Sequence, residues 1–482
     1  MTESLPYAVP RNQNSPVSPP YGLYPELISG TAFTAPRNSN YYTWTYRKYP
    51  SVSQLSRLDD GGGGGGSVYR KYKGSKNFYA TSTASTSAEG VTPEPYRFKA
   101  TEQAQGLGDK QVDWIDSLFT IAYHKGAACG VYDFDKDMSS EMRVFMHHDA
   151  DVMLLPRENV LNIRTELGVL RAGPREMVLL PRGIKFTVDK VEDGRARGYF
   201  LENYGAPFKI PDLGPIGITS GLAHPRHFRA PTASAVEGGD GQQRHLEFIS
   251  KFNGSMYLLG GVGLAAGWVS FIIHGRFIYT YLSRLNKTPY DVVGWFGNYY
   301  PTVYDLGLFM AMNTVTYDHP DPSIGVVLQS PSLSYAPGTA NIDFVIFPPR
   351  WLTSENTFRP PWFHRNVMSE FMGLLYGGYD AKQGFEPGCS SIHNKLSPHG
   401  PDRATAVGSS NDGRPERYYG TLAFMWESDE AWIPTEQALA VLKDDTYIDC
   451  WVGDGGDEQW ERFDPTRRPA HPDRLAFDPN QV

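Results

Sequence analysis

The chain has 482 residues, of which 40% are hydrophobic and 20% charged; this balance excludes an intrinsically disordered protein and allows two or three domains with cores of their own. The net charge of −8 argues against general nucleic-acid binding, for which a basic surface is the usual footprint. The 49 glycines and 37 prolines indicate many turns, which favour short strands over long helices.

The cysteines give no sign of a disulfide framework or a zinc site. Cys129, Cys389 and Cys450 are odd in number and widely spaced, and they form no CxxC pair. This usage fits a reducing compartment. The first residues, MTESLPYAVPRNQNSP, lack the apolar core of a signal peptide. We therefore predict a cytoplasmic protein.

Strands are predicted in the first half of the chain. Short apolar or alternating runs, bounded by Pro, Gly and Asp, follow one another between residues 112 and 210. Among them, residues 166–188 are similar to the strand–turn–strand units of cupin-type jelly rolls. His147 and His148 are adjacent, so on a strand they point to opposite faces and cannot bind one ion together. We interpret this half as a β-sandwich without a metal site.

Residues 256–275 contain no formally charged side chain, over about the length that spans a bilayer. Several glycines in this run weaken a helix. We therefore predict no membrane insertion.

Strands are predicted again beyond residue 290, followed by a short helix and a frayed tail. The predicted strands include residues 291–296, 325–330, 341–349 and 420–428, the helix covers 434–444, and the tail covers 451–482.

The stretch 359–402 concentrates residues that can bind a metal. Non-haem Fe(II) enzymes use two neutral imidazoles and one carboxylate on one face of the metal. His364 and Glu370 are six residues apart, so in an extended segment their side chains share a face. His399, from a later loop, would complete the set. A lone histidine is more often a hydrogen-bonded polar residue than a ligand, so the spacing leaves both alternatives open.

The residues around these histidines closely resemble the homogentisate 1,2-dioxygenase family, iron enzymes of tyrosine breakdown. The resemblance is carried by 358–388 and by SPHGPD at 397–402, and it continues in the same order through 13–37, 208–228, 318–328 and 342–351. Together these stretches cover most of residues 11–430.

The resemblance supports an all-β fold, with an N-terminal β-sandwich over residues 1–285 and a C-terminal cupin-like jelly roll over 286–450. It implies a homo-oligomer, either a trimer or a hexamer. The family has a short connection where this chain has residues 260–281. We expect an insertion there, either natural or an artefact of the gene model. The family's glycine-rich opening is also missing, so the chain is expected to begin late.

The resemblance places the iron ligands on His364, Glu370 and His399, and substrate contacts on Tyr379, His393 and His399. It implies Fe(II) as the cofactor and the ring opening of homogentisate by O2 to maleylacetoacetate, in tyrosine and phenylalanine catabolism. A small aromatic substrate and O2 are thus the expected partners.

One position departs from the family. Its general base is a histidine in a GWHGNY-like motif, where this sequence has Phe296 in GWFGNY. Phenylalanine cannot accept a proton, and general-base help is worth about 10² to 10⁴ in rate. Three alternatives follow: a slower dioxygenase in which iron acidifies the phenol and His393 or water takes the proton, a paralogue for another dihydroxyaromatic, or a catalytically silent binding or structural subunit.

Residues beside His364 also differ from the family. Trp362 and Phe363 replace tyrosines, which indicates a changed pocket. Arg365 follows the ligand directly, so on a strand it faces away from His364. For Arg365 we predict a structural salt bridge rather than a contact with a substrate carboxylate.

Overall fold

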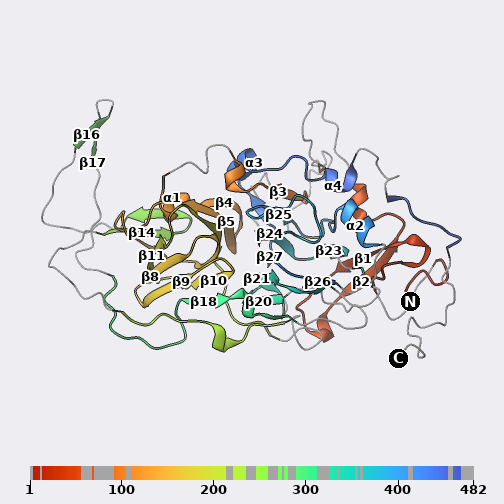
Figure 1. Ribbon diagram of the computed structural model, residues 1–482, viewed down its shortest axis with the longest axis horizontal. Coiled ribbons are helices and arrows are strands. Elements are labelled where there is room, and N and C mark those ends of the chain that lie inside the picture. Colours follow the sequence, from red (N-terminus) through yellow and green to blue (C-terminus); the bar gives the residue numbers. More distant parts are fainter. Residues whose placement is uncertain are drawn as a thin grey trace.

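The computed structural model describes most of the chain, and Figure 1 shows its elements coloured along the sequence. The described residues are all those outside 1–3, 11–13, 56–67, 70–91, 105–110, 213–220, 235–245, 259–269, 274–275, 280–288, 312–324, 335–336, 353–356, 359–361, 411–415, 454–459 and 468–482. Among them strands predominate and every α-helix is short, so the predicted all-β fold is confirmed.

The N-terminal half is a sandwich of two sheets. The larger sheet has seven strands in the order β18-β10-β7-β12-β5-β4-β28, and the smaller has six in the order β15-β14-β6-β11-β8-β9. Their bounds are β4 Phe119–His124, β5 Ala127–Phe134, β6 Arg143–His147, β7 Asp151–Glu158, β8 Leu161–Thr165, β9 Gly168–Ala172, β10 Glu176–Leu180, β11 Lys185–Lys190, β12 Ala196–Asn203, β14 Glu247–Phe252, β15 Ser255–Leu258, β18 Thr302–Asp305 and β28 Ile433–Pro434.

Apolar side chains fill the space between these two sheets. Trp114 opens helix α1 (Trp114–Ser117) and is fully buried. Its ring packs edge-on against Phe145 and Phe186 of the smaller sheet, each at 5.6 Å between centroids. This filling requires one apolar face on each strand, which is why the alternation between residues 112 and 210 predicted these strands correctly.

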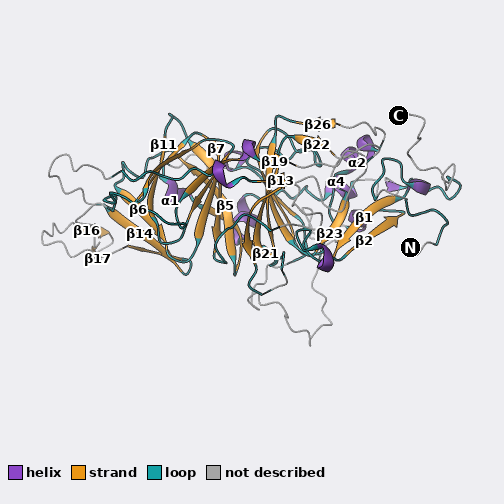
Figure 2. Ribbon diagram, turned by 90° about the horizontal axis from the view of Figure 1, so that it is seen from below, coloured by secondary structure: helices purple, strands orange, loops and turns teal. Residues whose placement is uncertain are grey.

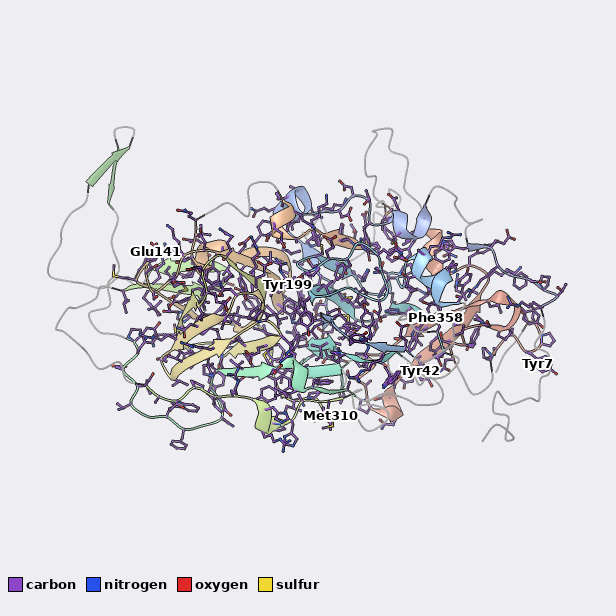
Figure 3. The ribbon with its side chains drawn as sticks, viewed as in Figure 1. Tyr7, Tyr42, Glu141, Tyr199, Met310 and Phe358 are labelled. Atoms are coloured by element: carbon purple, nitrogen blue, oxygen red, sulfur yellow. The ribbon has the colours of Figure 1, made fainter. Side chains whose placement is uncertain are left out.

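A second six-stranded sheet, in the order β20-β21-β27-β24-β25-β3, covers the other face of the seven-stranded sheet. Tyr199 of β12 lies between them near the middle of the molecule (Figure 3). Its hydroxyl donates to the Cys389 carbonyl at 2.7 Å, and its ring packs edge-on against Phe424 at 4.8 Å. The strands are β3 Tyr96–Phe98, β20 Gly325–Pro331, β21 Ala340–Phe347, β24 Ser369–Tyr376, β25 Ser390–His393 and β27 Leu422–Ser428. This sheet belongs to the predicted C-terminal cupin-like half.

A small sheet brings the start of the chain to the C-terminal half. β1 (Tyr24–Ser29) pairs antiparallel with β2 (Tyr42–Arg47) and parallel with β23 (Phe363–Asn366), and Figure 2 shows the three together at one end of the molecule. β3 also joins the C-terminal sheet, whereas β18 and β28 join the larger N-terminal sheet. The two halves therefore exchange strands across the predicted boundary at residues 285 and 286, and that division remains a prediction.

The remaining elements are short. The two-stranded ladders are β13 (Gly221–Leu222) with β19 (Met310–Ala311), β16 (Ser270–Ile273) with β17 (Arg276–Tyr279), and β22 (Arg350–Leu352) with β26 (Glu416–Tyr418). The further helices are α2 Arg403–Ser409, α3 Glu436–Val441, α4 Asp449–Val452 and the 3-10 turns Pro20–Gly22, Arg37–Ser39, Ser51–Gln54, Thr101–Gln103, Pro225–His227 and Leu306–Leu308. The helix predicted at 434–444 is confirmed as α3.

The expected insertion at 260–281 and the apolar run at 256–275 fall largely outside the described residues. The backbone of the insertion appears only as the β16–β17 hairpin, which is drawn away from the rest of the molecule in Figure 1. Across the described ranges, no helix combines the length and apolar character that a bilayer crossing needs.

The tail is ordered in part rather than frayed. Trp460 is buried, and its indole nitrogen donates to the Trp451 carbonyl at 2.8 Å. The Arg462 guanidinium lies 3.7 Å from the centre of the Tyr24 ring. Aromatic packing and this cation–π contact hold residues 460–467 against the start of the chain. Residues 468–482 are outside the described part.

His124, at the junction of the two halves, should make stability sensitive to acid. Its ring packs 4.4 Å from that of Trp432, its Nδ1 accepts from the Gly126 amide, and burial lowers its pKa to about 3. Between about pH 6.5 and 3, His124 is therefore protonated in the unfolded chain but neutral in the folded chain. The free energy of unfolding falls as the pH is lowered through that window, by about 1.4 kcal/mol per pH unit.

This pH dependence is tested with His124→Asn, which keeps an acceptor for Gly126 but does not titrate. Urea unfolding between pH 6.5 and 4 should show a flatter loss of stability in the variant than in the wild type. His148→Asn, which changes an exposed histidine, is the control and should keep the wild-type slope. Equal slopes for wild type and His124→Asn would contradict the prediction.

Candidate functional site

Glu370 lies on β24 and faces away from the seven-stranded sheet. Its neighbour Phe371 points into the core between the sheets, where it stacks on Trp426 at 5.6 Å. Because successive side chains of a strand alternate, Glu370 projects from the opposite face, together with Met372 and Leu374 of a second apolar cluster. The Glu370 side chain is only 6% exposed, so its carboxylate is largely removed from water.

His364 and His399 approach Glu370 from another layer. His364 lies on β23, and its backbone exchanges two hydrogen bonds with His399, at 2.9 and 3.1 Å. The expectation that His364 and Glu370 share one face of a single strand is wrong, because the chain turns at residues 367–368 between β23 and β24. The six-residue spacing instead lets the two side chains face each other across that turn.

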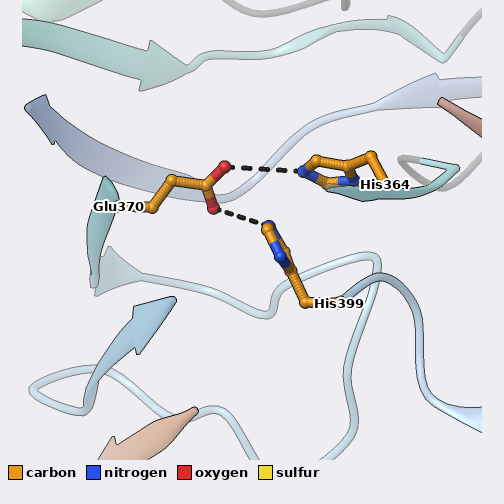
Figure 4. A group of neighbouring side chains, drawn as sticks. All are labelled: His364, Glu370 and His399. Atoms are coloured by element: carbon orange, nitrogen blue, oxygen red, sulfur yellow. Dashed lines mark hydrogen bonds and ion pairs between the residues drawn. The ribbon is translucent and has the colours of Figure 1, made fainter. Parts of the chain in front are cut away.

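The three side chains converge (Figure 4). His399 Nε2 lies 3.0 Å from Glu370 Oε2, and His364 Nε2 lies 3.5 Å from Glu370 Oε1. One donor atom from each residue fits within a span of 4.8 Å. On the other side of each ring, His364 Nδ1 is 2.7 Å from the Trp362 carbonyl and His399 Nδ1 is 2.9 Å from the Ser397 carbonyl.

This arrangement fits a divalent cation. A carbonyl only accepts, so each Nδ1 carries a proton, and each Nε2 is left to offer a lone pair to a cation beside the carboxylate. A cation placed between these two Nε2 atoms and the Glu370 carboxylate would be bound by both lone pairs and by the negative charge. Two imidazoles and one carboxylate are the donor set of non-haem Fe(II) sites. His364, Glu370 and His399 are therefore the residues that could hold a metal.

The electrostatics keep the carboxylate charged. Burial alone would raise the pKa of Glu370, but the adjacent His399, His364 and His393 hold that pKa well below its usual range. Burial lowers the pKa of His399 despite the attraction of Glu370. Glu370 is thus an anion beside a neutral His399. Against the effect of burial, Glu370 raises the pKa of His364, so this imidazole gives up a proton when a cation binds.

Of the other site residues, His393 lies against the cluster and Tyr379 stands apart from these contacts. The His393 ring stacks on that of His399 at 4.3 Å with 2° between the planes, and its side chain is 1% exposed. Tyr379 is half-buried and packs edge-on against Phe347 and Phe385, at 5.9 and 5.8 Å.

Phe296 does not join the cluster within one chain. Its side chain is 99% exposed. The surrounding segment is tied to the N-terminal sandwich, where Trp295 Nε1 donates to the Leu167 carbonyl at 3.0 Å and the Tyr299 hydroxyl donates to the Arg182 carbonyl at 2.9 Å. The strand predicted at 291–296 is wrong: these described residues pair with no neighbouring strand, and Phe296 packs on nothing.

The residues beside His364 take structural positions. Arg365 Nε lies 3.0 Å from Glu26 Oε1, so the predicted salt bridge is confirmed. Trp362 packs against the ring of Trp44 at 5.1 Å. Phe363 points away from the cluster to Trp460 at 5.8 Å.

The sequence interpretation missed a row of polar side chains beside Glu370. Cross-strand register aligns Gln329, Asp343, Glu427, Glu370 and His393 on five neighbouring strands. Directly opposed residues project from the same face of a sheet. Each residue comes from a different strand, and only the register places them together, so no local sequence pattern could have identified the row.

Two further carboxyls of this row, Glu427 and Asp343, are held toward their neutral forms. Burial, then the charges of Glu370 and Asp343, raise the pKa of Glu427 well above its usual range. Burial raises the pKa of Asp343 to about 7. Asn366 donates to Glu427 Oε1 at 2.7 Å, and Gln329 donates to Asp343 Oδ1 at 2.8 Å. Glu370 is therefore charged beside a neutral Glu427.

Fold and site together define a cupin-like, all-β protein with a His–Glu–His cluster suited to a metal. The chain matches two family models: homogentisate 1,2-dioxygenase N-terminal over residues 1–261, and homogentisate 1,2-dioxygenase C-terminal over residues 307–455. It is 41% identical over 479 residues to homogentisate 1,2-dioxygenase of Pseudomonas fluorescens (strain Pf0-1), covering 97% of this chain and 96% of that protein. The chain belongs to the homogentisate 1,2-dioxygenase family.

Solved structures similar to parts of the chain include two cupin domains. One is a cupin-2 domain protein from Shewanella frigidimarina NCIMB 400, with 15% identity, a TM-score of 0.15, and coverage of 18% of this chain and 78% of that chain. The other is the Schizosaccharomyces pombe Cnp3 cupin domain, with 12% identity, a TM-score of 0.16, and coverage of 17% and 59%. At such TM-scores the likeness carries no argument, and the fold rests on the strands themselves.

Proposed function

We propose that this protein is an Fe(II)-dependent dioxygenase that opens the ring of homogentisate with O2 to give maleylacetoacetate, in tyrosine and phenylalanine catabolism. The observation that carries the proposal is the convergence of His364 Nε2 and His399 Nε2 on the Glu370 carboxylate, in a chain of the homogentisate 1,2-dioxygenase family. We further propose a cytoplasmic location, from the cysteine usage.

In this proposal His364, Glu370 and His399 hold the iron. Bound Fe(II) supplies the redox chemistry that lets O2 react with an aromatic ring. The chain's own residues hold the ligands in place and leave one side open. The His364 side chain is 20% exposed, compared with 5% for His399, so substrate and O2 approach from the His364 side.

Tyr379 and His399 are the proposed substrate contacts. Burial, with the nearby carboxylates of Asp380 and Glu370, raises the pKa of Tyr379 well above its usual range. Its hydroxyl therefore keeps its proton and can donate a hydrogen bond to a substrate oxygen. Phe347 and Phe385 on either side supply apolar walls that favour an aromatic ring over water.

The position of Phe296 constrains the proposal. The family places a general base at this position, yet in one chain Phe296 is exposed on the N-terminal sandwich. We propose that the protein is a homo-oligomer, either a trimer or a hexamer. A base at position 296 could then act only if this position in one copy faces the His–Glu–His cluster of another copy. The alternatives are a paralogue for another dihydroxyaromatic and a catalytically silent subunit.

The proposal is tested by O2 uptake of protein purified without oxygen, loaded with Fe(II) and given homogentisate. Uptake with appearance of the maleylacetoacetate absorbance supports it. Uptake with another dihydroxyaromatic only would favour the paralogue. No uptake with any of them, in a protein that binds Fe(II), would favour the silent subunit.

Phe296→His should raise the rate if position 296 provides the base. We expect a gain of about 10²-fold, the lower end of what general-base help supplies. The assembled protein is the correct sample, because the position is far from the cluster within one chain. Tyr299→Phe in the same segment, which removes one hydrogen bond to Arg182, is the control and should leave the rate unchanged. An unchanged rate in Phe296→His would show that position 296 takes no part.

A further inference from the structure

His393 sits between the metal-site carboxylate and a buried pair of donors. It lies on β25 directly opposite Glu370 of β24. Its Nδ1 is 3.6 Å from Glu370 Oε2, beyond hydrogen-bond length but within the range of an ion pair, and its ring is stacked on His399. The atom on the far side of the ring, Nε2, points away from the cluster, and its surroundings decide what Nδ1 can do.

Nε2 of His393 faces a lysine and a tyrosine. Lys382 Nζ lies 3.1 Å from this nitrogen, and the Tyr447 hydroxyl lies 2.7 Å from it. Lys382 Nζ also donates to the Tyr447 hydroxyl at 2.5 Å, which closes a triangle of three polar atoms. Lys382 is 7% exposed and Tyr447 is 3% exposed, so both are removed from water. None of these contacts is used by the proposed metal or substrate binding.

The chemistry of the triangle selects one form of the imidazole. An ammonium has three N–H donors and no lone pair, so beside Lys382 the Nε2 atom of His393 must accept. The Tyr447 hydroxyl accepts from Lys382, and its own proton can then be donated to the same Nε2. With Nε2 as the acceptor of a neutral ring, the proton is on Nδ1, the atom that faces Glu370.

We propose that Lys382 and Tyr447 are positioning residues: they fix His393 as the Nδ1–H imidazole, and this N–H, directed at Glu370, stabilises the charged carboxylate that would bind the metal. This assignment rests on the proposed metal-dependent function. It replaces the substrate contact that the family resemblance implies for His393. It also explains why a fourth nitrogen so close to the cluster is not a ligand, because a protonated Nδ1 has no lone pair for a metal.

The charge of Lys382 sets the conditions of the test. Burial lowers its pKa to about 7, opposed by Cys450, Glu370 and Asp402 and aided by Arg97. Below that value the amine is an ammonium and can only donate, so the experiments are made near pH 6. The rings of Tyr447 and Trp451, at 5.1 and 5.0 Å from Nζ, complete its surroundings.

The first measurement is the tautomer of His393 in metal-free protein labelled with ¹⁵N-histidine. The His393 signal is assigned as the one that disappears in His393→Asn. In the wild type this signal should have the ¹⁵N chemical shifts of an imidazole protonated at Nδ1. Lys382→Met keeps the length of the side chain without its donors and should shift that signal toward the other tautomer. Lys382→Gln, which retains an N–H donor, should restore it in part. An Nε2–H ring in the wild type, or no change in Lys382→Met, would overturn the proposal.

The second measurement is Fe(II) affinity by competition with a chelator under anaerobic conditions. Supporting residues of a metal ligand are typically worth about 10- to 100-fold in affinity, which is the loss expected for Lys382→Met and for Tyr447→Phe. Their combination should lose little more than either alone, because both act through His393. Lys99→Met, at an exposed lysine, is the control.

The two measurements separate this proposal from the function on which it rests. A wild type that shows the Nδ1–H tautomer but no Fe(II) binding would leave the hydrogen-bond assignment standing and refute the metal function. Normal Fe(II) affinity in both Lys382→Met and Tyr447→Phe would refute the positioning role and leave the metal function standing.

Discussion

Glu370→Gln should lose bound Fe(II) and, with it, homogentisate-dependent O2 uptake. Glutamine has the same shape but no charge, and among the described residues Glu370 supplies the carboxylate that faces Nε2 of both His364 and His399. Even residues that merely support a ligand cost about 10- to 100-fold, so the loss of the anionic ligand itself should exceed about 10²-fold in affinity. Metal content after anaerobic loading and O2 uptake are the two measurements.

Glu427→Gln is the matched control. Glu427 stands opposite Glu370 in the same sheet, and burial with its two acidic neighbours keeps it protonated. An amide resembles the neutral acid and can still accept from Asn366. This variant should therefore retain Fe(II) and most of the activity. Iron retained by Glu370→Gln, or lost equally in both variants, would show that the carboxylate is not a ligand.

The strands of the N-terminal half could be predicted because their environment imposes a local pattern. β7 and β12 pair along their length in the middle of a stack of sheets, and each has a buried apolar centre, residues 152–155 in β7 and 199–201 in β12. Residues 291–296 have the same apolar character but lie exposed, with Val293 84% accessible. Composition alone does not distinguish an apolar segment that packs in the core from one that is exposed on the surface of a single chain.

The site could be predicted in its members but not in its geometry. His364, Glu370 and His399 fall in one stretch of sequence, and the donor set is recognisable from residue types. Their arrangement depends on β1 pairing in parallel with β23 across more than three hundred residues. No local signal encodes such a pairing, so a turn was mistaken for a straight strand.

Lys382 and Tyr447 illustrate the same limit. They are 65 residues apart in sequence, and neither stands in a pattern that marks a site. What joins them is the burial of His393 between two layers, together with the rule that buried polar atoms need partners. Such residues are recognised from the hydrogen-bond partners that a buried side chain requires, and not from a sequence motif.

Lys251→Met should strongly destabilise the N-terminal half. Lys251 Nζ lies 2.6 and 2.8 Å from the two oxygens of Glu202, a residue 2% exposed, and His147 Nε2 is 3.4 Å from the same carboxylate. Removing the lysine leaves a buried charge without its main partner, which costs about 3 to 5 kcal/mol. Urea unfolding at neutral pH measures the loss.

Two further variants test the cause of this loss. Adding Glu202→Gln to Lys251→Met removes the stranded charge and should recover most of the stability, because a buried ion pair taken out as a whole is often neutral. Lys185→Met breaks a more exposed pair with Glu166 at 3.1 Å and should cost no more than about 1 kcal/mol. A double variant as unstable as Lys251→Met would mean that packing, and not charge, is responsible.

The pH dependence of the same pair has a definite sign. Burial would raise the pKa of Glu202, but His147 and Lys251 lower it to about 2, below the 4.5 of a free glutamate. The pair therefore stabilises the fold fully above about pH 4.5 and loses its contribution as the pH falls from there toward 2. In the variant with both Lys251→Met and Glu202→Gln this acid-dependent loss should be absent, since no carboxylate remains to take up the proton.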